Sequence, residues 1–442
     1  MTERFADIIG LIRKEVKPAL GCTEPIAVAL AVAKAVEIIE DRCSYGADRG
    51  DWRMAADMDV KVAVSGNILK NGMGVGIPGT GMVGLYIASA LGAVCGRSEY
   101  GLEVLHDIDE KYIARARRMV EDRKIRIELA DTDKKLYIKA SVGTGDGHTA
   151  SAVIENDHDN IVETWFDDHI LVCSTAGDVA DQGHRDTKDY GLTVKEIYDF
   201  AKTVDYDDIK FILESRDLNL TLAEEGLKGD YGLKVGKTIH CSRHRKVFGN
   251  DFMSYAMSLT AAASDARMAG CTLPAMSNSG SGNQGITVTM PVIAYAIKHG
   301  IDDETLARAL VLSHLTAIHI KGYLGKLSAL CGCVIASTGS ACGLVYMRGG
   351  SYEAVCSAIK NMIGNITGMV CDGAKVGCAM KVASGVSSAI QSAVLAMDGT
   401  CISENDGIIE KDIEKTIRNL GRIGSVGMQS ADSMILDIMV CK

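Results

Sequence analysis

The sequence predicts a chain of two parts, an N-terminal mixed α/β domain followed by an all-helical domain. Strand-like alternation of apolar and polar residues is confined to roughly the first third of the 442 residues. Helical periodicity dominates after about residue 190. A chain of this length has room for two or three domains. We therefore expect an α/β domain over residues 1–190 and a helical domain over residues 191–442.

The α/β part is expected to begin with two helices separated by a short loop. In that loop Cys22 or Thr23 is in position to cap the second helix, and Pro25 suits its first turn. A glycine-rich loop that ends at Gly81 is expected after the first strand. The predicted helices are 4–17, 25–40, 82–91 and 110–122, and the predicted strands are 59–65, 102–105, 125–129, 136–141 and 150–155.

Helical patterns fill the second part almost without interruption. One segment, Leu327–Met347, carries no charge over 21 residues and is long enough to span a membrane. Its density in Gly, Ser, Thr and Cys favours instead a buried helix pair near a cofactor. The other predicted helices are 193–203, 207–227, 251–269, 283–299, 303–320, 351–368, 384–397, 409–420 and 429–440.

Composition and charge exclude several partners. The formal net charge is −10 and no basic stripe occurs, which argues against nucleic acid. The N-terminal residues are charged throughout and lack the apolar core of a signal peptide. Fourteen cysteines in such a chain favour the reducing cytosol, where thiols bind metals or catalyse. We expect a cytoplasmic protein without a membrane partner and leave open whether it forms a homo-oligomer.

Cysteine is concentrated in the last quarter of the chain. Eight of the fourteen cysteines lie there, after the last histidine, His319. Thiolates without imidazole suit an iron–sulfur cluster better than a mixed zinc site. Three ligands would leave one iron of a four-iron cluster open as a Lewis acid, a position that the penultimate residue, Cys441, could reach. The candidate ligands are Cys371 and Cys378, with Cys333 or Cys331 as the third and Cys342 as a weaker rival.

Cys22 is the candidate base. Backbone N–H groups and the dipole at a helix start lower the pKa of a thiol, and a thiolate there could abstract a proton. The alternative is a buried loop cysteine without a chemical role.

Two glycine-rich loops are candidates for substrate contacts. The stretch Ser277–Gly285 precedes an apolar helix, and amides at such a helix start suit a carboxylate. Its side-chain donors are Ser277, Asn278, Ser279 and Asn283. The stretch Gly74–Gly79 matches G-x-G-x-x-G, but it does not follow its strand directly, so a loop over the substrate pocket is favoured over a dinucleotide site.

These segments together resemble the L-cysteine desulfidase family, also called the YhaM or UPF0597 family. The resemblance extends essentially from end to end, and the family is related to the α-domain of iron–sulfur L-serine dehydratases. It is carried by GCTEP at 21–25, SGN at 65–67, NGMGVGIPG at 71–79, SNSGSGNQG at 277–285, and the cysteine segments at 332–333, 341–342 and 371–373. It implies a helical domain like the serine dehydratase α-domain.

The resemblance also implies roles for individual residues. Cys22 stands where the dehydratases have histidine and takes the role of base. The cluster ligands map to Cys333, Cys371 and Cys378. Thr23, Ser65 and Asn67 join the loop residues as substrate-binding candidates.

The expected activity is that of a [4Fe-4S]-dependent carbon–sulfur lyase. L-cysteine and water would give pyruvate, ammonia and hydrogen sulfide, with the open iron stabilising the leaving thiolate. One alternative is an L-serine dehydratase with the same cluster, and Cys22 in place of histidine argues against it. An alternative of another class is a non-catalytic iron–sulfur redox sensor or structural metalloprotein.

Overall fold

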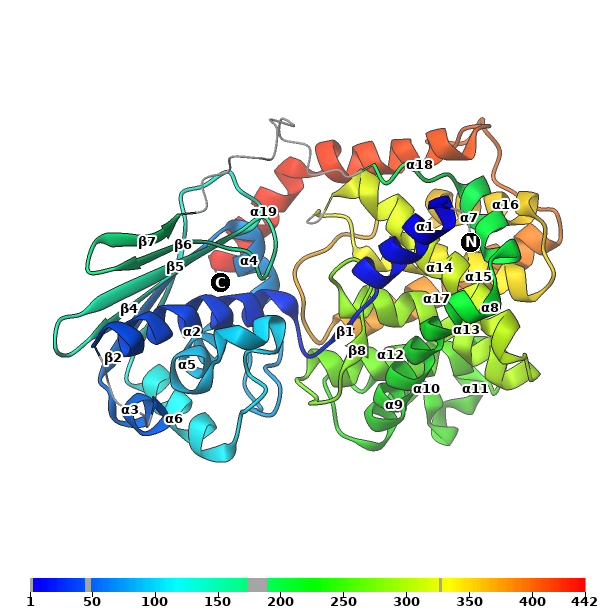
Figure 1. The fold of residues 1–442 in the computed structure, drawn as a ribbon. Coiled ribbons are helices and arrows are strands. Elements are labelled where there is room, and N and C mark those ends of the chain that lie inside the picture. The colour runs from blue at the N-terminus through cyan, green and yellow to red at the C-terminus, as the bar shows by residue number, and fades with distance from the viewer. Residues whose placement is uncertain (1–2, 44–48, 174–188, 326–327, 442) are drawn as a thin grey trace.

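The computed structural model describes residues 3–43, 49–173, 189–325 and 328–441. Two parts lie side by side, a mixed sheet with helices on one face and a larger body of helices (Figure 1). This arrangement confirms the predicted fold class.

A six-stranded sheet forms the centre of the first part. Its order is β3-β2-β4-β5-β6-β7; β2 and β3 are parallel and the other neighbours are antiparallel. Alternate residues of β2 are buried, so the sheet turns one apolar face to the core. The strands are β2 (Met58–Val64), β3 (Ile125–Leu129), β4 (Tyr137–Thr144), β5 (Thr149–Glu155), β6 (Ile161–Phe166) and β7 (His169–Cys173).

Helices cover the apolar face of this sheet. The long helix α2 (Thr23–Cys43) packs against α5 (Leu85–Cys95), and both bury nearly every apolar side chain. They approach closely because Gly92 has no side chain: a Cβ there would stand 2.5 Å from the carbonyl oxygen of Ala29. The other helices of this part are α3 (Arg49–Ala55), α4 (Gly66–Gly72), η1 (Ser98–Glu103) and α6 (Glu110–Glu121).

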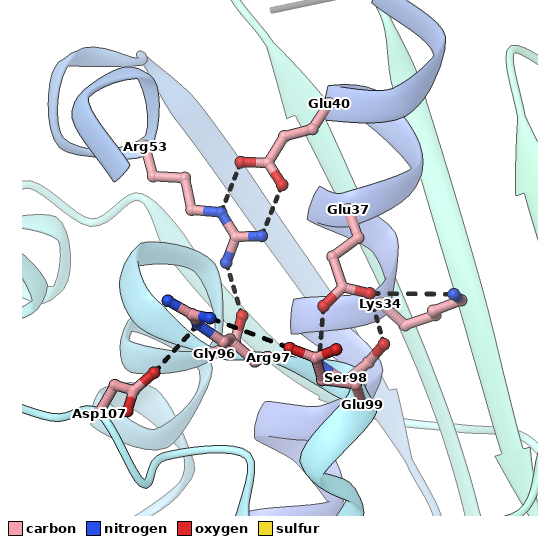
Figure 2. A network of polar contacts seen from close by, with 9 residues as sticks. All are labelled: Lys34, Glu37, Glu40, Arg53, Gly96, Arg97, Ser98, Glu99 and Asp107. Carbon is pink, nitrogen blue, oxygen red and sulfur yellow. Dashed lines mark hydrogen bonds and ion pairs between the residues drawn. The ribbon is translucent and has the colours of Figure 1, made fainter. Parts of the chain in front are cut away.

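A buried ion pair fixes the far end of α2. The guanidinium of Arg53 in α3 makes two bonds to Glu40 of α2, Nε to Oε1 at 2.7 Å and Nη2 to Oε2 at 2.6 Å. Its Nη1 donates to the carbonyl oxygen of Gly96, at the end of α5, at 2.6 Å. One turn away on α2, Glu37 accepts the N–H of Ser98 at 2.7 Å (Figure 2). These bonds fix the positions of α2, α3 and the end of α5 relative to one another.

The second part is helical and is built around α15 (Gly332–Met347). This helix packs against α13, α14, α16 and α17 and is almost entirely buried. Side-chain N-caps define many helix starts, for example Ser281 for α13 and Asp302 for α14. The other helices are α7 (Val194–Thr203), α8 (Tyr206–Ile209), η2 (Lys210–Leu213), α9 (Glu214–Lys228), α10 (Val235–His240), η3 (Ser242–His244), α11 (Arg245–Phe248), α12 (Phe252–Met268), α13 (Gly282–His299), α14 (Asp303–Leu324), α16 (Tyr352–Ile366), α17 (Cys378–Met397), α18 (Ile413–Arg422), η4 (Ile423–Gly427) and α19 (Gln429–Val440).

The two ends of the chain cross between the parts (Figure 1). The first helix, α1 (Glu3–Glu15), buries Ile8 and Ile12 in the helical core. The short strand β1 (Pro18–Ala19) then pairs with β8 (Ala275–Met276). At the other end, α19 packs against α4 of the α/β part. The boundary near residue 190 stays a prediction, and these two helices are exceptions to any division made there.

Most predicted elements occur with small shifts, but several features differ. Residues 102–105 do not form the predicted strand; they lie in η1 and the turn after it. Strands β6 and β7 were not predicted, and α4 interrupts the predicted glycine-rich loop. In the uncharged segment, Leu327 lies outside the described residues, and the rest includes the single buried helix α15 instead of a pair. No helix in the described part of the chain is long and apolar enough to cross a membrane.

Candidate active site

A cavity of about 140 Å³ lies where the two parts meet. A buried cavity of ~150 Å³ can take up a molecule as large as benzene. Four long helices, α2, α13, α15 and α17, begin at the cavity wall. Each helix start carries unpaired N–H groups and partial positive charge, so together they favour anionic groups in the cavity.

Four thiols from the helical part line this cavity: Cys331, Cys333, Cys371 and Cys378. Backbone pairing brings their segments together. The N–H of Cys331 donates to the carbonyl oxygen of Met369 at 3.0 Å, and the N–H of Cys371 donates to that of Ala329 at 2.6 Å. Cys378 opens α17. The weaker rival, Cys342, is buried within α15 and is not part of the cavity wall.

The thiols fit a cluster better than a single metal ion. Burial raises the pKa of Cys331 to about 12 and also raises the pKa of Cys333 and Cys378, so ligation needs a metal charge to remove their protons. No three His, Cys, Asp or Glu side chains among the described residues are grouped closely enough to hold one ion. In a four-iron cluster each thiolate binds a different iron, so the ligands stand around it. Thiols spread around one cavity match that arrangement.

Two lysines hold the loop that carries Cys371. Nζ of Lys375 lies 2.5 Å from Oδ2 of Asp372, and Lys381 pairs with Oδ1 of the same carboxylate. Although burial raises the pKa of Asp372, the two lysines lower it overall to about 2. Lys381 lies in α17, so these bonds tie Cys371 to the helix that begins with Cys378.

Cys22 directly precedes α2 and lines the same cavity. Nη2 of Arg267 donates to its Sγ at 3.6 Å and to the carbonyl oxygen of Gly21 at 2.7 Å. Burial raises the pKa of the Cys22 thiol to about 12, while Arg267 acts in the opposite direction. The lowered pKa expected from a helix start is therefore outweighed by burial in this structure.

The α/β part adds a small polar network beside Cys22. The hydroxyl of Thr23 donates to Oε2 of Glu24 and to the carbonyl oxygen of Gly280, both at 3.3 Å. Nδ2 of Asn71 in α4 donates to Oε1 of Glu24 at 3.1 Å. These bonds join α2, α4 and the serine-rich loop, residues 277–285, around the cavity. Thr23, Glu24, Asn71 and Gly280 all line it.

The predicted substrate-binding residues fall into two groups. Thr23 and Asn283 line the cavity, together with Gly280, Ser281 and Gln284, which were not singled out. The others do not belong to its wall: Ser65, Asn67, Ser277, Asn278 and Ser279.

Some of the predicted residues outside the wall have structural partners. Asn278 is fully buried; its Oδ1 accepts from Gln284 at 2.6 Å and its Nδ2 lies 3.0 Å from Nδ1 of His314. Ser65 donates to the carbonyl oxygen of Lys135 at 2.8 Å and thereby ties α4 to the sheet.

Sequence reasoning missed the cationic side chains of the cavity, Arg267, Lys321 and Lys381. Burial lowers the pKa of Lys321 to about 8. Each of the three lies within a helix, and no sequence motif includes it. The one available signal was a charged residue within an otherwise small or apolar helical stretch, as at Arg267.

Comparisons with known proteins show the family of this chain. The family profile described as serine dehydratase alpha chain matches residues 99–437. A UPF0597 protein of Phocaeicola vulgatus is 49% identical over 437 residues, covering 98% of this chain and 97% of that protein. UPF0597 proteins of Bacteroides fragilis and Oleidesulfovibrio alaskensis are 48% and 50% identical, over 98% of this chain and 98% and 97% of theirs. The chain therefore belongs to the serine dehydratase alpha chain family and, within it, to the UPF0597 proteins.

Proposed function

We propose that this protein is an iron–sulfur lyase that converts L-cysteine and water to pyruvate, ammonia and hydrogen sulfide. Membership of the serine dehydratase alpha chain family supports a lyase-type enzyme. The observation that carries the proposal is the meeting of Cys22 with four further thiols around one small cavity.

The thiols Cys331, Cys333, Cys371 and Cys378 provide more than the three ligands that a site-differentiated cluster needs. When bound there, such a cluster supplies an open iron as a Lewis acid for the leaving group. Which of Cys331 and Cys333 is a ligand stays open, because both line the cavity.

Cys22 is the proposed base for the α-proton. It directly precedes α2, and Arg267 at 3.6 Å favours its thiolate form against the burial that raises the pKa of Cys22 overall to about 12. Loss of the α-proton and of the β-sulfur as hydrogen sulfide leaves aminoacrylate, which water hydrolyses to pyruvate and ammonia. The volume of the cavity, about 140 Å³, suits a small amino acid.

L-serine dehydration is the second candidate, favoured by the name of the matching family profile. The same groups would act, with hydroxide as the leaving group. A redox sensor or structural metalloprotein without turnover is the candidate of another class, and the small-molecule cavity beside the thiols speaks against it.

The test is an assay of anaerobically prepared protein with L-cysteine and with L-serine. We expect sulfide and pyruvate in equal amounts from L-cysteine, with higher kcat/KM than for L-serine. Cys22→Ser should reduce kcat at least about a hundredfold, as expected for loss of a general base, and retain the iron.

The matched control is Cys271→Ser, because Cys271 is also buried but lies outside the cavity wall. Cys271→Ser should keep its activity. A higher kcat/KM for L-serine would favour the dehydratase. Iron-loaded protein that turns over neither amino acid would contradict the proposal.

A further inference from the structure

Arg267 is a buried cation at the cavity wall. It lies near the end of α12 and is only 4% exposed. Its hydrogen bonds go to uncharged groups: the carbonyl oxygen of Gly21 at 2.7 Å, Oδ1 of Asn283 at 3.4 Å, Sδ of Met268 at 3.4 Å and the thiol of Cys22. Its Nε has no acceptor among the described residues. Taking a charge out of water is costly unless an opposite charge accompanies it.

Two candidate carboxylates bond to groups other than Arg267. Glu24 accepts from Asn71 and Thr23. Asp265, two residues before Arg267, accepts the N–H of Gly236 with its Oδ2 at 2.9 Å at the start of α10, and its Oδ1 has no partner among the described residues. In the part of the chain that the structure describes, none of the hydrogen bonds of Arg267 goes to an Asp or Glu.

The start of α13 faces the same space. Ser281, Asn283 and Gln284 line the cavity. The N–H groups of Gln284 and Gly285 donate to Ser281 at 3.3 and 3.0 Å, which leaves those of Gly282 and Asn283 without an acceptor among the described residues. The guanidinium of Arg267 packs against Gly282, where a Cβ would stand 2.1 Å from its Nε. An unpaired arginine and a helix start therefore lie together at one corner of the cavity, and both favour an anion.

We propose that this corner is the subsite for the α-carboxylate of the substrate. Arg267 supplies the counter-charge, and Ser281, Asn283 and the first-turn amides of α13 supply further donors. This inference rests on the proposed function, because it takes a small amino acid as the ligand. The sequence predicted Ser277, Asn278 and Ser279 as carboxylate contacts, but these side chains do not line the cavity. The subsite at Arg267 takes their place.

The position of this corner suits the chemistry. The α-proton is on the carbon that is bonded to the carboxylate, and Nη2 of Arg267 is 3.6 Å from the thiol of Cys22. A carboxylate held by Arg267 brings the α-carbon beside Cys22 and leaves the β-substituent free to point toward Cys371 and Cys378. Lys381, another cation of the wall, is already paired with Asp372. Arg267 is thus a specificity-determining residue for α-carboxylates.

The experiment compares two unreactive ligands by calorimetry on the iron-loaded protein. L-alanine has the amine and carboxylate but no leaving group, and L-alaninamide lacks the negative charge. The wild-type protein should bind L-alanine about ten- to a hundredfold more tightly, as expected for hydrogen bonds to a charged group. Equal binding of the two ligands by the wild type would overturn the inference without any variant.

Variants then assign the preference to Arg267. Arg267→Gln should abolish the preference for L-alanine and raise KM for L-cysteine about ten- to a hundredfold. Arg267→Lys should keep part of the preference, because it retains the charge but not the planar fork. The control is Arg308→Gln, since Arg308 also donates to carbonyl oxygens, at 2.9 and 3.0 Å, but lies away from the cavity. It should keep the wild-type preference.

The outcomes separate the two proposals. If Arg267→Gln folds, as judged by circular dichroism, and still prefers L-alanine, the subsite is wrong even if the wild type degrades L-cysteine. If the wild type shows the carboxylate preference and loses it in Arg267→Gln but releases no sulfide, the subsite stands and the proposed reaction fails. If Arg267→Gln does not fold, the wild-type and Arg267→Lys measurements decide.

Discussion

At the scale of single residues, the site combines thiols that the chain keeps far apart in sequence. Cys331, Cys333, Cys371 and Cys378 line one cavity, whereas Cys342 is buried in the same helix as Cys333 but outside the wall. Burial alone therefore does not separate a ligand from a core cysteine. A position at the cavity wall distinguishes the proposed ligands from a core cysteine such as Cys342.

This difference predicts the iron content of serine variants. Cys371→Ser and Cys378→Ser should lose most of their iron and acid-labile sulfide, because a hydroxyl is a poor ligand for iron in such a cluster. Cys342→Ser should keep both. The measurement is iron and sulfide analysis with absorption spectra of anaerobic protein. Full iron content in Cys371→Ser would remove that residue from the ligand set.

At the scale of elements, helix α2 is fixed at both ends. Its first turn stands at the cavity, with Cys22 just before it and Thr23 bonded to the serine-rich loop. Its last turns are held by the bonds of Glu40 to Arg53 and of Glu37 to Ser98 (Figure 2). The far ion pair therefore contributes to the placement of Cys22, the proposed base.

Breaking that ion pair should be costly. Arg53→Met leaves Glu40, which is 4% exposed, as an unpaired buried charge, and we expect a loss of about 3–5 kcal/mol in the free energy of unfolding. Lys195→Met removes a half-exposed pair with Asp199 and should change stability by less than about 1 kcal/mol. Urea unfolding followed by circular dichroism measures both. Equal effects of the two substitutions would show that the buried pair has no special role.

At the scale of the whole molecule, the chain returns to its first part through α19. Lys70 of α4 is 2% exposed and pairs with Asp432 of α19. The carbonyl oxygen of Lys70 also lies 2.3 Å from where a Cβ of Gly373 would stand, in the loop between Cys371 and Cys378. The C-terminal helix, α4 and the cysteine loop thus form one contact between the two parts.

Asp432→Asn should loosen this contact. It leaves the Lys70 ammonium buried without its counter-charge, and we expect a loss of about 3 kcal/mol in the free energy of unfolding. Asp437→Asn on the same helix is the control, because Asp437 is exposed. Both variants are compared by urea unfolding at the same iron loading. Identical midpoints would contradict a stabilising role of the Lys70–Asp432 pair.

The site was predictable in part. The concentration of cysteine and the position of Cys22 before a helix pointed to residues that do line the cavity. Of the predicted donors in the Ser277–Gly285 loop, Asn283 lines the cavity, whereas Ser277, Asn278 and Ser279 do not. Asn278 turns inward to Gln284 and His314, while Ser281 and Gln284 reach the cavity. A loop sequence shows which donors are available, and packing determines which way each one points.

The sequence by itself determined the division into an α/β and a helical part and most helices and strands, because the period of apolar residues follows from backbone geometry. It also determined the chemistry of the candidate metal ligands, since the cysteines of the last quarter of the chain are not accompanied by histidine. Only the tertiary structure decided that α1 joins the helical core, that α19 returns to α4, and that Arg267 lies beside Cys22. These contacts join residues hundreds of positions apart, and no local pattern records which distant surfaces will bury one another.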